Sequence, residues 1–344
     1  MLYIRTDMNG TIATGHMMRC LAIADALKKR QEDVCFLLAD DNAVSLLEKR
    51  GHKYWVMGTD WQNMESELPY LEKLISERHI SKMLVDSYQV TPRYLKWLQE
   101  RIWTSYIDDI NAFLYPVDGL ICYANYWKNF HYESRYAKTE LCMGMDYVPL
   151  REAFQGCAPK KIRKHVERVL ILSGGSDQYD MLRRIVREIS GFIDAGIDVI
   201  CGAYYPHYEA VCGEYRQQGN ISFHRAVSNM EDYMKNADIA VSAGGTTLYE
   251  LCACGTPAIS YSTADNQLDN VRQFASDGLI PYAGDAREMR VEGQIAAILQ
   301  QCMEDREWRE ERARRMQQMI DGNGAGRIAE WLCKDRENRA VNSV

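Results

Sequence analysis

Short apolar stretches alternate with stretches of helical spacing through most of the chain. In the first half, runs typical of buried strands cover residues 2–6, 34–39, 53–57, 82–86, 104–108 and 119–123. Between the first two runs, apolar side chains recur on one helix face at Met17, Cys20, Leu21, Ala24 and Leu27. Continuous apolar strands that are separated by helices indicate a parallel sheet covered on both faces.

The alternation stops at residues 156–167, which read GCAPKKIRKHVE and show no apolar periodicity, and then restarts. The later strand-like runs lie within residues 168–177, 198–203, 221–226, 238–245 and 257–262. We therefore predict an α/β protein of two Rossmann-like domains, 1–155 and 168–335, with a solvated linker at 156–167 and a tail at 336–344. Because such sheets bind ligands at the carboxyl ends of their strands, we expect a site in a cleft between the domains.

Composition excludes some classes of function and leaves the predicted fold unchanged. A length of 344 residues favours two domains, and a net charge of −7 argues against a nucleic-acid binder. No apolar run reaches the length of about 18 residues that a membrane span needs, and the N-terminus lacks a signal-peptide pattern. The 11 cysteines are odd in number and scattered. We therefore expect reduced thiols, a cytoplasmic location and no stable membrane insertion.

The stretch SAGGTTLYELCACGTPAI, residues 242–259, carries the strongest indication of a ligand site. A strand ends at Ser242, two glycines follow, and Thr246 and Thr247 stand where a new helix begins. Glycines let a phosphate approach the backbone, and a helix N-terminus offers free N–H groups at a positive dipole end. Glu250 lies one turn further on, where it can accept from a ribose diol. The alternative is an ordinary strand–turn–helix connection with Glu250 on the surface.

Two further turns in the second half are weaker indications. LSGGSD, which contains Gly174, follows a strand but lacks the fingerprints of both a dinucleotide fold and a P-loop. DNQLDN follows the strand PAISYS and holds Asn266 and Gln267, whose amides both donate and accept and so suit sugar hydroxyls. A tight turn and a helix N-cap are the respective alternatives.

A histidine follows a Thr-Gly pair at the expected start of the first helix. If Thr14 is the N-cap, Gly15 and His16 occupy the first turn, where the positive end of the helix disfavours a cationic imidazole. A neutral His16 keeps a lone pair, as a general base requires, and Gly15 leaves access to it open. A histidine at the edge of the core, without a chemical role, is the other interpretation.

Carboxylates stand at two strand ends in the same half, with Asp86 in LVDSYQ and Asp108 and Asp109 in YIDDINAF. Acidic residues at strand ends belong either to a functional site or to a helix N-cap. The cysteine spacings match no zinc pattern, and the acids form neither an H-E-x-x-H motif nor the D-x-D of glycosyltransferases. We therefore expect no metal ion and no cofactor.

Several motifs, taken together and in order, resemble one family. They are RTD, ATGHMMRCLAIA, VDSY, IDD, YANYW, GMDYVPLREAF, LILSGGSD, VSNMEDYMKNADIAVSAGGTTLYELCACGTPAI and DNQ. This set resembles the UDP-sugar hydrolases of pseudaminic acid biosynthesis and the related spore-coat polysaccharide proteins. The second half is also similar to the N-acetylglucosaminyltransferase of peptidoglycan synthesis. The resemblance covers residues 1–335 and implies a fold of the GT-B type, with UDP held mainly by the second domain.

The resemblance also implies a reaction and a set of residues. It implies metal-independent hydrolysis of a UDP-linked 2,4-diacetamido-2,4,6-trideoxy sugar to UDP and the free sugar. His16 then activates the attacking water, and Asp86 and Tyr88 belong to the same catalytic group. Substrate and UDP contacts fall on Gly15, Arg19, Asn125, Gly174, Gly244, Gly245, Thr246, Thr247, Glu250, Asn266 and Gln267.

Two other functions agree with the same residues. A GT-B glycosyltransferase of surface or spore-coat polysaccharide synthesis would use the base at His16 to deprotonate an acceptor hydroxyl in place of water. A nucleotide-sugar binding protein without activity would keep the turn at 242–250 and would not need His16. The sequence leaves the oligomeric state and the particular UDP-sugar open.

Overall fold

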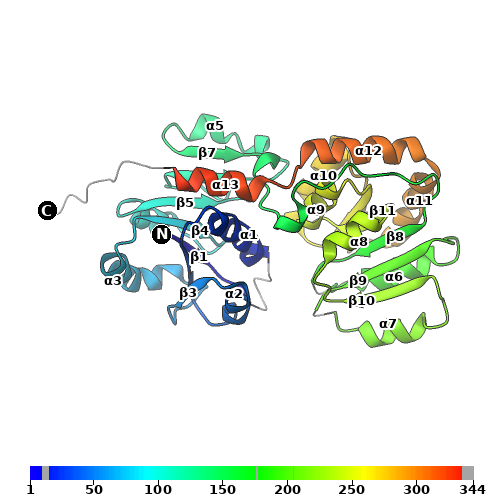
Figure 1. Cartoon of the computed structure of the whole chain (residues 1–344), viewed down its shortest axis with the longest axis horizontal. Coiled ribbons are helices and arrows are strands. Elements are labelled where there is room, and N and C mark those ends of the chain that lie inside the picture. The colour runs from blue at the N-terminus through cyan, green and yellow to red at the C-terminus, as the bar shows by residue number, and fades with distance from the viewer. Residues whose placement is uncertain (10–14, 176, 204, 335–344) are drawn as a thin grey trace. The chain divides into compact units, whose positions relative to one another are not determined.

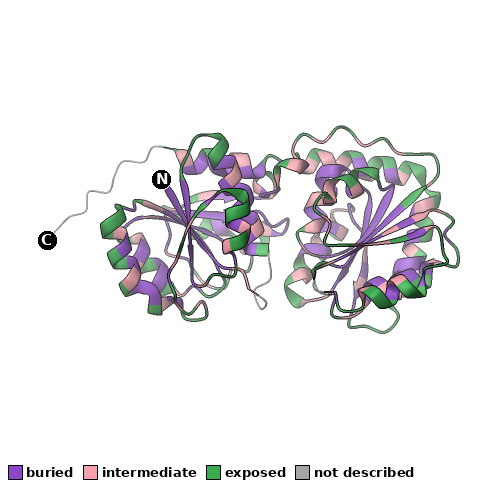
Figure 2. Ribbon diagram, turned by 60° about the horizontal axis from the view of Figure 1, so that its bottom comes forward, coloured by how far each residue is buried: buried purple, intermediate pink, exposed green. Residues whose placement is uncertain are grey.

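Each half of the chain folds around its own parallel β-sheet in the computed structural model, which describes residues 1–9, 15–175, 177–203 and 205–334 (Figure 1). The first unit consists of Met1–Glu152 and of the stretch that begins at Asn323, and the second unit is Ala153–Gly322. Strands lie buried at the centre of each unit, and the exposed residues lie on the outer faces of the helices (Figure 2). Two Rossmann-like units are thereby confirmed.

The described part of the first unit contains seven strands in the order β3-β2-β1-β4-β5-β6-β7, all paired in parallel. The strands are β1 (Leu2–Thr6), β2 (Val34–Leu38), β3 (Lys53–Val56), β4 (Lys82–Asp86), β5 (Trp103–Ile107), β6 (Gly119–Cys122) and β7 (Glu140–Met143). The helices are α1 (Gly15–Lys29), α2 (Val44–Arg50), α3 (Leu68–Arg78), α4 (Pro92–Gln99), α5 (Tyr132–Arg135) and α13 (Gly324–Cys333).

The described part of the second unit contains six parallel strands in the order β10-β9-β8-β11-β12-β13. The strands are β8 (Arg168–Leu172), β9 (Gly196–Cys201), β10 (Ile221–Arg225), β11 (Ile239–Ala243), β12 (Ala258–Ser262) and β13 (Tyr282–Asp285). The helices are α6 (Met181–Ile189), α7 (Tyr208–Glu214), α8 (Met230–Asn236), α9 (Thr247–Cys254), α10 (Leu268–Ser276), α11 (Val291–Glu304) and α12 (Arg306–Met319).

The order of the strands sets where ligands bind in such sheets. In the first unit, successive strands are added toward one edge of the sheet from β1 to β3 and toward the other edge from β4 onward; in the second unit the same switch falls between β8 and β11. A crevice opens at the carboxyl ends of the two strands that flank such a switch point. The loops after β1, β4, β8 and β11 are therefore the places where this fold puts a site.

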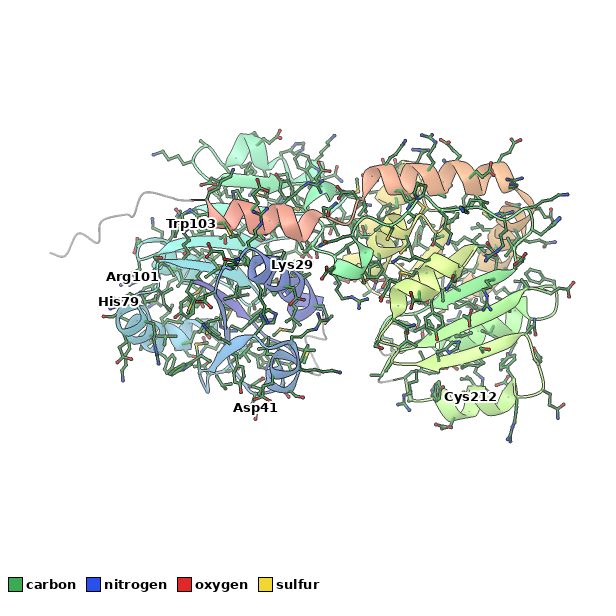
Figure 3. The ribbon with its side chains drawn as sticks, in the orientation of Figure 1. Lys29, Asp41, His79, Arg101, Trp103 and Cys212 are labelled. Atoms are coloured by element: carbon green, nitrogen blue, oxygen red, sulfur yellow. The ribbon has the colours of Figure 1, made fainter. Side chains whose placement is uncertain are left out.

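The predicted domain limits differ from the observed units at the C-terminus. The last helix, α13, does not stay with the second unit, to which residues up to 335 were assigned, but lies beside α1 in the first unit (Figure 1). Trp331 of α13 stacks edge-on against Trp103 with ring centroids 5.3 Å apart, and its Nε1 donates to Glu140 Oε2 at 2.7 Å. Figure 3 shows Trp103 close to this helix. Gly119 leaves room for the indole, since an added Cβ would come within 2.4 Å of Trp331.

Trp331→Ala is expected to destabilise the first unit by about 3–5 kcal/mol, because it empties a buried site and leaves Glu140 without the indole donor. Urea unfolding followed by far-ultraviolet circular dichroism measures the change. Trp308→Ala, which removes a tryptophan of α12 in the second unit, is the matched control. Equal unfolding curves for wild type and Trp331→Ala would contradict this role of α13.

The basic stretch 156–167 is part of the second unit and not a separate linker, which corrects the prediction, whereas most of its residues are exposed as expected. Lys160 Nζ donates to the carbonyls of Lys235 and Ala237, both at 2.6 Å, where α8 ends. Burial lowers the pKa of Lys160 to about 8. The guanidinium of Arg309, fully buried on α12, donates to the carbonyls of Arg163 and Lys164. The contacts of Lys160 and Arg309 thus tie this irregular stretch to α8 and α12 through backbone carbonyls.

The two edge strands β7 and β13 were not predicted. Each is four residues long, and the apolar run is only three residues in ELCM and two in YAGD. In β13 half-buried positions alternate with buried ones, and in β7 only Cys142 is buried, as suits strands at the margin of a sheet. No helix of the described residues is long and apolar enough to cross a membrane.

Candidate active site

His16 and Asp86 meet at the switch point of the first sheet. Asp86 is the last residue of β4, paired in register with Thr6 at the end of β1, and His16 lies in the first turn of α1, which follows β1. The Nδ1 atom of His16 is 2.6 Å from Oδ1 of Asp86. Gly15 begins the helix and is exposed, whereas Thr14, the predicted N-cap, lies outside the described residues.

Arg19, one turn further along α1, is the centre of this cluster. Its Nε and Nη2 bind both oxygens of Asp86, at 2.6 and 2.5 Å. Its Nη1 donates to Asp109 Oδ2 at 2.9 Å and to the Tyr123 hydroxyl at 2.7 Å. The residue is buried, and each nitrogen of its guanidinium faces a protein acceptor. The geometry therefore gives Arg19 the position of a residue that orients Asp86, and the substrate contact that the resemblance implies stays a prediction.

The cluster holds Asp86 as a carboxylate. Burial by itself raises the pKa of Asp86, but the charge of Arg19, then His16, and the hydrogen bonds from both outweigh it and hold the pKa well below its usual range. Arg19 is one cation between two carboxylates, Asp86 and Asp109. A proton that arrives on His16 therefore enters a cluster with an excess of negative charge.

Tyr88 covers one face of the histidine. Its ring packs edge-on against the imidazole with centroids 4.5 Å apart, and Tyr88 is still 39% exposed. The Nδ1 atom of His16 has two polar neighbours, Oδ1 of Asp86 and Nη2 of Arg19, and the latter lies 2.9 Å away. Within the described part of the chain, Nε2 of His16 contacts no hydrogen-bonding partner. The ring is thus held from one side and presents its other nitrogen to the space beside Tyr88.

Asp108 and Asn125 are the remaining candidate residues of the first unit. Asp108 accepts from the Tyr115 hydroxyl at 2.9 Å and from the backbone of Ile110 and Asn111, so it stabilises the turn after β5. Burial raises the pKa of Asp108 despite these hydrogen bonds. Asn125 is buried three residues after β6 ends.

In the second unit, the two glycine turns flank the other switch point. LSGGSD follows β8 and the Gly244–Gly245 turn follows β11, and these strands pair through Ser242 and Leu172. Helix α9 then begins at Thr247, with Thr246 as its N-cap residue. Among the described residues, no acceptor is paired with the backbone N–H groups of Gly245, Thr246 and Thr247. The turn therefore presents three donors at the positive end of a helix.

The amide turn lies against the same glycines. Asn266 and Gln267 form a short 3₁₀ turn, Asp265–Gln267, after β12. The Cβ of Gln267 is 3.3 Å from where a side chain on Gly244 would begin, and its Oε1 accepts from Thr263 N at 2.9 Å. Because that oxygen is occupied, the side chain offers a ligand its N–H donors. Glu250 lies half-buried in the first turn of α9, and Gly174 is exposed after β8.

The structure gives a place in the two sites to four residues that were assigned no role from the sequence. Asp109 and Tyr123 complete the shell around Arg19, and Tyr249 and Asn270 lie behind the Gly244 turn. The sequence indicated Asp109, because this residue follows the end of β5, the strand that lies next to β4. Tyr123, Tyr249 and Asn270 lie within quoted motifs, but no pattern indicates what they do, because their partners come from other elements. No group of three His, Cys, Asp or Glu side chains within the described ranges is arranged to hold a metal ion.

Sequence comparison relates parts of this chain to known proteins. Residues 169–328 match the glycosyltransferase family 28 C-terminal domain. The spore coat polysaccharide biosynthesis protein SpsG of Bacillus subtilis is 28% identical over 144 residues, 41% of this chain and 42% of that protein. A Helicobacter pylori protein, "pseudaminic acid cytidylyltransferase and UDP-2,4-diacetamido-2,4,6-trideoxy-beta-L-altropyranose hydrolase", is 24% identical over 272 residues, 78% of this chain. The match spans 46% of that relative, so the chain covers less than half the length of both proteins.

Solved structures place the whole chain in one fold. MurG of Acinetobacter baumannii superposes with a TM-score of 0.71 at 13% identity, over 96% of this chain and 99% of that one. The spinosyn rhamnosyltransferase SpnG, complexed with thymidine diphosphate, gives 0.66 at 13% identity over 96% and 100%. The chain is therefore a protein of the GT-B fold, which confirms the predicted fold class. The segment that matches glycosyltransferase family 28, residues 169–328, lies mostly in the second unit, and the chain is similar to SpsG and MurG.

Proposed function

We propose that this chain hydrolyses a UDP-linked sugar, with a diacetamido-trideoxy sugar as the substrate class. The observation that carries the proposal is the His16–Asp86 pair, 2.6 Å apart at the switch point of its sheet. The relative from Helicobacter pylori, whose name includes such a hydrolase, supports the choice of sugar. The three donors at Gly245, Thr246 and Thr247 support a diphosphate as the leaving group.

In the proposed reaction, Asp86 accepts from Nδ1–H of His16, so that Nε2 carries the lone pair. Nε2 takes a proton from water, and the water oxygen attacks the anomeric carbon as the bond from that carbon to the diphosphate oxygen breaks. UDP leaves with the bonding electrons, and the proton stays on His16 until it passes to solvent. The excess negative charge of Asp86 and Asp109 stabilises the imidazolium.

The second unit would bind the leaving group. Backbone N–H groups from Gly245 to Thr247 and the positive end of α9 match the charge of a diphosphate, so the proposed reaction uses no metal ion. Glu250 is proposed to accept from the ribose, and Gln267 to donate to an oxygen of the substrate. Such an arrangement stabilises charge that grows as the bond to UDP breaks.

A glycosyltransferase is the second candidate. The match of residues 169–328 to glycosyltransferase family 28 favours it, and the same base could deprotonate an acceptor hydroxyl. A binding protein without activity would keep the turn at Gly244 but has no use for the buried His16–Asp86–Arg19 cluster.

One assay separates the three functions. A panel of UDP-linked deoxy-amino sugars is incubated with the protein, without acceptor and with a chelator, and free UDP is measured. Hydrolysis predicts UDP release from at least one 2,4-diacetamido sugar. Release that begins only when an acceptor is added supports the transferase, and binding of UDP-sugar without release under either condition supports the binding protein.

A further inference from the structure

Two buried side chains lie behind the Gly244 turn and form a short hydrogen-bond relay. The Tyr249 hydroxyl donates to Asn270 Oδ1 at 2.7 Å, and Asn270 Nδ2 donates to the Gly244 carbonyl at 2.9 Å. Tyr249 is 3% and Asn270 6% exposed. The Tyr249 ring also packs against Phe274 of α10, with centroids 5.4 Å apart. Since the amide oxygen accepts from the tyrosine, the amide nitrogen is the atom that faces the carbonyl.

This relay fixes the direction of one peptide group. In a planar trans peptide the C=O and the following N–H point in opposite directions, and the described chain contains no cis peptide. A Gly244 carbonyl held inward by Asn270 therefore turns the N–H of Gly245 outward. That N–H belongs to the set of three donors in front of α9.

A hydrogen bond that fixes this peptide is needed because the residues on both sides of it, Gly244 and Gly245, are glycines. Glycine accepts both signs of φ, so a peptide between two glycines can turn over at little cost. Turned over, it would present a carbonyl to a bound anion in place of a donor. A residue with a side chain at position 244 cannot restrict the peptide instead, because an added Cβ would come within 2.3 Å of Val271 Cγ1. The direction of the peptide then depends on the hydrogen bond from Asn270.

We propose that Tyr249 and Asn270 are positioning residues that hold the N–H of Gly245 toward the diphosphate of the substrate. The inference rests on the proposed function, since it takes a uridine diphosphate as the ligand of this turn. The relay acts on the diphosphate only and has no part in holding the uridine. Its loss should therefore weaken the binding of UDP but not of uridine.

Tyr249→Phe tests the relay, because it removes one oxygen and keeps the ring against Phe274. Without the tyrosine donor, the Asn270 amide can turn its oxygen toward Gly244 and release the peptide. We expect UDP to bind about fivefold to tenfold more weakly, the loss of about one hydrogen bond, with uridine affinity unchanged. Asn270→Leu, which removes the donor itself, is expected to act in the same direction. Isothermal titration with UDP and with uridine gives both affinities.

Tyr208→Phe is the matched control in the same unit. Its hydroxyl donates to the Phe223 carbonyl at 3.2 Å, on β10, and its loss should leave both affinities at the wild-type value. Wild-type UDP affinity in Tyr249→Phe and Asn270→Leu would overturn the inference, and so would an equal loss for UDP and uridine. If the unaltered protein bound no UDP, the proposed function would fail first, which distinguishes the two failures.

Discussion

His16→Ala is expected to slow UDP release about 10²–10⁴-fold, the range that a positioned general base contributes. The variant removes the nitrogen that faces the space beside Tyr88 and leaves Asp86 and Arg19 paired with each other. UDP affinity should stay close to the wild-type value, because the donors from Gly245 to Thr247 lie in the other unit. Initial rates of UDP release and titration with UDP measure the two quantities separately.

The first unit offers a close control for this variant. His52 is also buried and also paired with a carboxylate, since its Nε2 lies 2.7 Å from Asp25 Oδ1, but it lies between α2 and β3. His52→Ala should lose stability without a specific loss of turnover. A His16→Ala enzyme that works at the wild-type rate would exclude His16 as the base. Equal losses in both variants would trace the effect to folding.

The parts of the molecule that follow from local pattern were predictable. β1, β2, β11 and β12 are buried along their whole length and consist mostly of apolar residues, so each is recognisable as a buried strand in the sequence. The sequences that precede α1 and α9 contain glycine and threonine, which are typical of a helix start. Parallel strands then bring the ends of β1 and β4 together, which is why His16 and Asp86, 70 residues apart, are in contact.

The parts that depend on distant partners were not predictable in this way. Arg19 lies on the same helix face as His16, but only the order β1-β4-β5 shows that Asp109 reaches it. The helix α13 has an ordinary apolar face, and its return to the first unit depends on the space that Gly119 leaves for Trp331. Lys160 looks like one charge of a solvated run until α8 supplies the carbonyls that surround it.

Asp86→Asn is expected to cost about 3–5 kcal/mol of unfolding free energy in the first unit, because it leaves the buried Arg19 without its main counter-charge. The same change removes the acceptor that orients Nδ1 of His16, so turnover should fall together with stability. Urea unfolding at pH 7 followed by tryptophan fluorescence reports mainly on this unit, since every tryptophan except Trp308 belongs to it. Asp25→Asn, at a partly exposed pair with Arg50, should cost less than about 1 kcal/mol.

The pH dependence of the free energy of unfolding provides a second, independent test of the Asp86 prediction. The pKa of Asp86 is held well below its usual range in the folded protein, so the unfolded chain takes up a proton first as the pH falls. The stability that Asp86 contributes is therefore complete above the unfolded pKa of about 4 and is lost below it. Between pH 7 and pH 3, the free energy of unfolding should fall less in Asp86→Asn than in wild type, so that the values of the two proteins approach each other. Parallel curves would mean that Arg19 does not depend on the charge of Asp86, and an Asp86→Asn protein as stable as wild type at pH 7 would contradict the cluster as described.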